Sequence, residues 1–99
     1  MAKHSRCTHM IISDHAHNRW PLRAPGQHEL GAGHIMRRLN NMLHLGIQLD
    51  STCCIWVPVS RRLSAVCMPQ TGDAGGGWLV ITYKYHRDWS KFNRREVAR

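Results

Sequence analysis

The sequence has no long apolar run. Its longest, 53–59, is seven residues and includes Pro58, whereas a helix that crosses a bilayer needs about 20 apolar residues. The sequence therefore excludes a membrane-spanning helix, and we expect no membrane partner.

Cysteine pairing motifs are also absent. The four cysteines form no Cys-x-x-Cys pair and no regular spacing, and the basic N-terminus does not read as a secretory signal. Disulfide frameworks belong to oxidising compartments, so we expect reduced thiols and a cytoplasmic location.

Acidic residues are few. The six Asp and Glu are scattered, no two close enough to suggest a catalytic carboxylate pair, and no motif marks a Ser or Cys nucleophile. These absences favour a binding protein over an enzyme.

Positive charge, in contrast, is abundant. Lys and Arg number 14, giving a formal net charge of +8. Eleven of the 14 are arginine, whose planar guanidinium binds phosphate through a bidentate fork. The balance predicts a nucleic-acid partner, RNA or DNA. The alternative is an inhibitor or assembly subunit that docks its basic face on an acidic protein.

Hydrophobic periodicity predicts one main helix, over 34–48. Ile35, Leu39 and Met42 recur at helical spacing with further apolar residues on the same stripe, and Gly46 either ends the helix or loosens its last turn. Residues 18–33 are punctuated by prolines and glycines, so we expect most of that stretch to be loop.

Strands are expected at 8–13, 52–59, 63–68 and 78–86. Pro58 predicts an edge strand or a strand end. In the last strand, simple alternation puts Tyr83 and Tyr85 on one face and Trp78 and Lys84 on the other. A second helix is expected at 88–99, with Asp88 as its N-cap.

The predicted fold class is α+β. Ninety-nine residues make one domain, 1–99, in which residues 1–6 and a basic tail, 94–99, are expected to be flexible. The predicted order is β-α-β-β-β-α, with an antiparallel sheet of three to four strands packed against the one main helix.

The segment 83–95, YKYHRDWSKFNRR, alternates aromatic and basic residues. Bases stack on aromatic rings while Arg and Lys hold phosphates, so this pattern favours nucleic-acid binding. The alternative is that the aromatics are core anchors. The binding residues predicted here are Lys84, Tyr85, His86, Arg87, Trp89, Lys91, Arg94 and Arg95.

Two further basic pairs join this prediction. Arg37 and Arg38 lie on or beside the polar face of the main helix, which follows the glycine-rich stretch 31–33, and Arg61 and Arg62 lie in an expected turn. A helix N-terminus attracts anions, although the alternative is a simply exposed helix face.

Seven of the eight histidines lie in the first 44 residues. Cys7, His9, His15 and His17 share one side of an extended chain, which makes them an alternative zinc site. Their spacing matches no known finger or ribbon, so no cofactor is predicted, and the two histidines are expected at a strand end.

One short stretch of the sequence resembles a known enzyme family. The stretch MIISDHAH is similar to the first strand of amidohydrolase-type metal hydrolases, which ends in a His-x-His pair. Those enzymes need a far longer barrel and more ligands, so their activity is not carried over.

The element order and basic composition resemble the small mRNA-cleaving toxins of bacterial toxin–antitoxin pairs. The residue types that such toxins use occur at Arg61, Arg62, Lys84, Tyr85 and His86. The resemblance implies a metal-independent ribonuclease in which Arg stabilises the phosphorane and His86 or Tyr85 transfers protons. The two-helix hairpin usual before the sheet of these toxins is not evident in the sequence.

Overall fold

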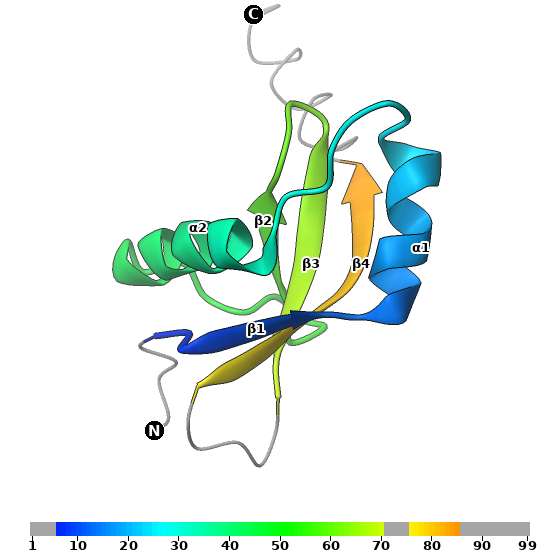
Figure 1. Ribbon diagram of the computed structural model, residues 1–99. Helices are drawn as coiled ribbons and strands as arrows, with labels where there is room; N and C mark the ends of the chain where they lie inside the picture. Colours follow the sequence, from blue (N-terminus) through cyan, green and yellow to red (C-terminus); the bar gives the residue numbers. More distant parts are fainter. Residues whose placement is uncertain (1–5, 71–75, 86–99) are drawn as a thin grey trace, which may run out of the picture.

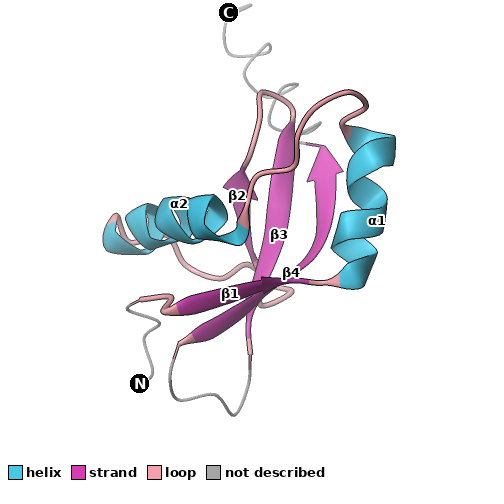
Figure 2. Cartoon of the chain, in the orientation of Figure 1, coloured by secondary structure: helices cyan, strands magenta, loops and turns pink. Residues whose placement is uncertain are grey.

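The computed structural model describes residues 6–70 and 76–85 (Figure 1). It is a small α+β domain with a four-stranded sheet and two helices (Figure 2). The elements are β1 (His9–Ile12), α1 (Asp14–Arg23), α2 (Ala32–His44), β2 (Ile55–Pro58), β3 (Leu63–Pro69) and β4 (Gly77–Tyr85). All four strands were expected from the sequence, whereas the helix expected at 88–99 lies outside the described residues.

The sheet is mixed, and the prediction of a purely antiparallel sheet is wrong. Its strand order is β1-β4-β3-β2, in which β2, β3 and β4 are antiparallel neighbours and β1 pairs with β4 in parallel. Parallel neighbours need a long crossover connection, and the two helices supply one between β1 and the rest of the sheet. Pro58 ends the edge strand β2, as predicted.

Helix α1 occupies a stretch expected to be a strand end followed by loop, so that prediction is wrong. Ser13 caps the helix by accepting a hydrogen bond from the Ala16 amide at 3.1 Å. Pro21 lies inside it and removes one helical hydrogen bond, at a typical cost of about 3 kcal/mol. Burial of Ala16 and Trp20 against β4 offsets that cost.

Helix α2 confirms the main predicted helix but begins and ends earlier than expected. Gly31 stands at its N-cap, and its C-cap is Leu45, followed by Gly46 at a φ of 91°. That backbone conformation favours glycine, so Gly46 ends the helix.

A β-bulge overturns the predicted alternation in β4. Cys67 pairs with Val80 and Val66 pairs with Thr82, so Ile81 is an extra residue in β4. One inserted residue exchanges the two faces of everything that follows. Tyr83 therefore joins Trp78 and Val80 in the core.

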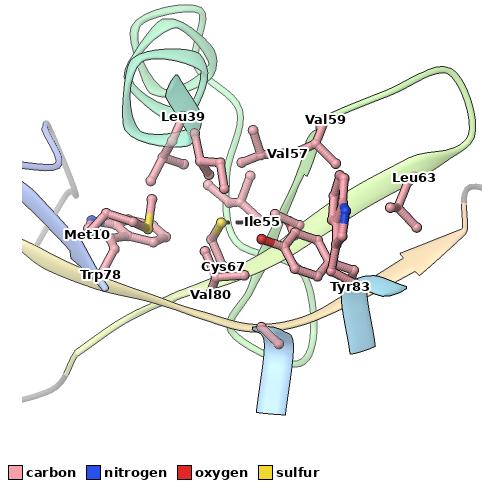
Figure 3. Close-up of a cluster of buried hydrophobic side chains, with 14 of the residues drawn as sticks. Met10, Leu39, Ile55, Val57, Val59, Leu63, Cys67, Trp78, Val80 and Tyr83 are labelled. Atoms are coloured by element: carbon pink, nitrogen blue, oxygen red, sulfur yellow. Dashed lines mark hydrogen bonds between the residues drawn. The ribbon is translucent and has the colours of Figure 1, made fainter. Parts of the chain in front are cut away.

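The core lies between the sheet and the two helices (Figure 3). Tyr83, Trp78 and Val80 of β4 meet Val57 of β2 and Leu39 of α2 there. Helix α2 packs against β1 and β2, and α1 runs beside β4 (Figure 1). Neither helix of the described residues is long and apolar enough to cross a membrane.

Candidate nucleic-acid interface

One end of the sheet gathers predicted binding residues from two separate segments. Arg61 and Arg62 lie in the turn between β2 and β3, and both are exposed. Lys84 and Tyr85 end β4, where they pair with Ser64 and Leu63, the first residues after that turn. The register therefore places the two arginines beside the end of β4.

Arg38 reaches the same end from helix α2. Its Nη1 donates a hydrogen bond to the backbone oxygen of Pro58 at 2.9 Å, and Pro58 directly precedes the β2–β3 turn. Arg37, the residue before it, is exposed on α2. We call Arg38, Arg61, Arg62, Lys84 and Tyr85 the basic end.

The remaining predicted binding residues lie outside the described part of the chain. They are His86, Arg87, Trp89, Lys91, Arg94 and Arg95.

Tyr85 contacts Arg23, a cation that the sequence did not predict as a binding residue. The Arg23 guanidinium lies 5.4 Å from the centre of the Tyr85 ring, and the Tyr85 hydroxyl donates to the backbone oxygen of Arg23 at 3.1 Å. The Arg23 Nε is buried and has no hydrogen-bond partner within the described residues. Arg23 thus ties the end of α1 to the basic end.

Trp56 is a further aromatic residue near this end, and the sequence did not predict it as a binding residue. The Lys84 ammonium lies 5.9 Å from the centre of its ring, within the range of a cation–π contact. Its neighbours Ile55 and Val57 are buried in the core, whereas Trp56 is 38% exposed. The alternation of Ile55, Trp56 and Val57 was the sequence signal that the indole points away from the core.

Carboxylates do not neutralise the basic end within the described residues. In that part of the chain the short contact between a basic side chain and a carboxylate joins His17 Nδ1 and Glu29 Oε1 at 2.8 Å. Arg61, Arg62 and Lys84 are exposed and form no ion pair with a carboxylate of residues 6–70 and 76–85.

A polar cluster holds the loop between the helices against β4. Glu29 accepts hydrogen bonds from the Tyr83 hydroxyl at 2.6 Å and from His17 at 2.8 Å. Trp20 meets Tyr83 edge-on at a centroid distance of 4.9 Å and donates from Nε1 to the Gln27 oxygen at 2.8 Å. Burial and the hydrogen bond to Glu29 raise the pKa of Tyr83. We call His17, Glu29 and Tyr83 the Glu29 cluster.

The four residues of the alternative zinc site do not converge. Cys7 is buried and donates from Sγ to the His9 oxygen, His15 accepts from Arg19, and His17 binds Glu29. Within residues 6–70 and 76–85, no group of three or more His, Cys, Asp and Glu side chains lies close enough to hold a metal ion.

The buried thiols are poorly suited to nucleophilic chemistry. Burial raises the pKa of Cys7 to about 11 and that of Cys67 to about 12. Because the thiolate is the reactive form of cysteine, both side chains act as small apolar core residues.

Comparisons with known protein families, with curated proteins and with solved structures found no match to this chain.

Proposed function

We propose that this protein binds nucleic acid, RNA or DNA, through the basic end. The observation that carries the proposal is convergence: residues 38, 61–62 and 84–85 come from a helix, a turn and a strand end, yet they lie at one end of the sheet. Phosphate contacts supply most of the affinity of non-specific nucleic-acid binding. Exposed Arg and Lys side chains with an adjacent aromatic ring suit that role.

The test is the salt dependence of binding. Anisotropy of labelled RNA and DNA should show affinity falling by about tenfold or more between 50 and 200 mM salt, because each phosphate contact releases counterions. Arg61→Ala/Arg62→Ala should weaken binding and make the logarithmic slope shallower by about 1 to 2.

Arg6 provides a matched control for the single variant Arg61→Ala. It is exposed and precedes β1, whose register with β4 puts it at the opposite end of the sheet from Tyr85. Arg6→Ala also removes a positive charge, yet it should leave the slope almost unchanged. Affinity independent of salt, or equal losses in the two variants, would contradict binding at the basic end.

A second candidate function is a metal-independent ribonuclease. What favours it is that two helices, α1 and α2, precede the three antiparallel strands β2, β3 and β4. They do not form the hairpin usual in those toxins, because α1 packs against β4 whereas α2 packs against β1 and β2. The likeness is one of element order and residue type alone. Purified protein with a chelator should then cleave RNA, and Arg61→Ala or His86→Ala should abolish cleavage. Intact RNA after long incubation would exclude this candidate.

The same positive charge would suit an acidic protein. Affinity purification from lysate with and without nuclease treatment separates the two partners. Loss of the bound material after nuclease treatment supports nucleic acid, whereas one protein retained in fixed stoichiometry would replace the proposal with an inhibitor or assembly role.

A further inference from the structure

The face of the sheet opposite the core carries an aromatic ring near the basic end. Core residues of β2, β3 and β4 include Val57, Ala65 and Tyr83, so their sequence neighbours point to the other face. Trp56 lies there on the edge strand β2, in register with Val66 and, through it, with Thr82. The next row on this face is Pro58, Ser64 and Lys84. Val66 and Ser64, in the middle of these two rows, are buried, so the exposed part of this face is its edge at Trp56 and Pro58, together with Lys84.

Trp56 and Lys84 together offer a paired contact on this face. The indole is 38% exposed at the edge of the sheet, and the Lys84 ammonium lies 5.9 Å from its ring centre. A nucleotide has the complementary pair, a flat base and a charged phosphate. Lys84 lies over the indole, so a base that stacks there displaces the ammonium, which can then pair with the phosphate near the turn with Arg61.

We propose that Trp56 is a base-stacking residue and that the protein therefore selects single-stranded over double-stranded nucleic acid. This inference rests on the proposed function. In a duplex both faces of each base are already covered by stacked neighbours, so an indole on a sheet can contact only edges and backbone. An unpaired base exposes its faces and stacks.

Tyr85 is a poorer stacking residue despite its exposure. Its hydroxyl donates to the Arg23 backbone oxygen, which fixes the ring beside the end of α1. Its position beside Lys84 in β4 also points it to the other face of the sheet. The single-strand preference should therefore depend on Trp56 and persist in Tyr85→Leu.

The experiment compares a labelled 12-nucleotide RNA, alone and annealed to its complement, and the DNA equivalents, by anisotropy at one salt concentration. The wild-type protein should bind the single strands about fivefold tighter or more, the effect of one base–aromatic stack. Trp56→Ala should lose that preference through weaker single-strand binding alone, whereas Trp56→Phe should keep part of it.

Two controls separate stacking from other effects. Leu45→Ala truncates an apolar side chain that is 78% exposed, and it should change the affinity for neither single-stranded nor double-stranded probes. Thermal unfolding should show that Trp56→Ala stays folded. Equal affinity of the wild type for single and double strands, or an equal loss of both in Trp56→Ala, would overturn the role of Trp56 while leaving the proposed function intact. Absence of binding to every probe would overturn both.

Discussion

Tyr83 and Tyr85 stand two residues apart on β4 and have opposite surroundings. Tyr83 is fully buried and donates to Glu29, whereas Tyr85 is 43% exposed and carries the Arg23 guanidinium on its ring. The Glu29 cluster pairs its polar groups with one another, and the basic end leaves its cations exposed. The same residue types therefore stabilise the fold through buried contacts in one region and are exposed to solvent in the other.

The largest difference in the free energy of unfolding should be that between Tyr83→Ala and Tyr85→Ala. Tyr83→Ala removes a buried ring that packs on Trp20 and should lower the free energy of unfolding by about 3–5 kcal/mol. Tyr85→Ala should cost about 1 kcal/mol or less because its ring is largely exposed. Urea unfolding measures both, and equal losses would contradict the comparison.

The Glu29 cluster should also weaken when its acceptor is removed. Glu29→Ala leaves the buried Tyr83 hydroxyl without the partner that it has at 2.6 Å, and we expect a loss of about 1–3 kcal/mol. In the background of Tyr83→Phe, which has no hydroxyl, the same change should cost less. Additive losses in the double variant would show that the two side chains are not coupled.

Gly76 lies where the chain enters β4 and packs against the backbone just before β1. Its φ is +82°, and a Cβ there would lie 2.9 Å from the Arg6 backbone oxygen. Gly76→Ala should therefore destabilise the protein by about 1–2 kcal/mol. Gly33→Ala, inside α2 with open space around it, is the control and should stabilise by up to about 1 kcal/mol. Two changes of the same sign would contradict the assigned constraint.

Alkaline pH should destabilise the protein because its buried Cys67 thiol ionises more readily in the unfolded chain. Burial raises the pKa of Cys67 from 9.0 to about 12, so the folded state holds a proton that the unfolded state releases. The stabilisation is complete below pH 9 and is lost as pH rises toward 12, by about 1 kcal/mol at pH 10 from this thiol. Cys67→Ala should shrink the decline between pH 8 and 10, and an unchanged decline would exclude the thiol as its source.

The smallest effect on stability should come from the basic end. Arg61→Ala/Arg62→Ala removes exposed side chains with no carboxylate partner in the described residues, and the free energy of unfolding should change by less than about 0.5 kcal/mol. A loss of several kcal/mol would mean that this pair stabilises the fold, and its effect on binding would then need another explanation.

Local patterns predicted the four strands and α2 because period-2 and period-3.6 runs of apolar residues are strong signals. They failed at α1, where Pro21 disfavours a helix that burial of Trp20 nevertheless stabilises. They also failed at the second half of β4, because a bulge at Ile81 depends on the register with β3. Local sequence carries little information about either.

The candidate site was predicted in part. Arg38, Arg61, Arg62, Lys84 and Tyr85 were chosen for their residue types, and the structure brings them to one end of the sheet. Arg23 was missed because its stretch was expected to be loop. Trp56 was overlooked although the burial pattern around it was visible in the sequence.

Composition and residues close together in the chain specify the basic charge, the α+β class and the approximate positions of the four strands. Contacts between distant segments make β1 parallel to β4, join His17 to Tyr83 through Glu29, and bring residues 38, 61 and 84 to one end of the sheet. These outcomes depend on strand register and helix packing between segments far apart in sequence. Such contacts leave no periodic signal in the chain.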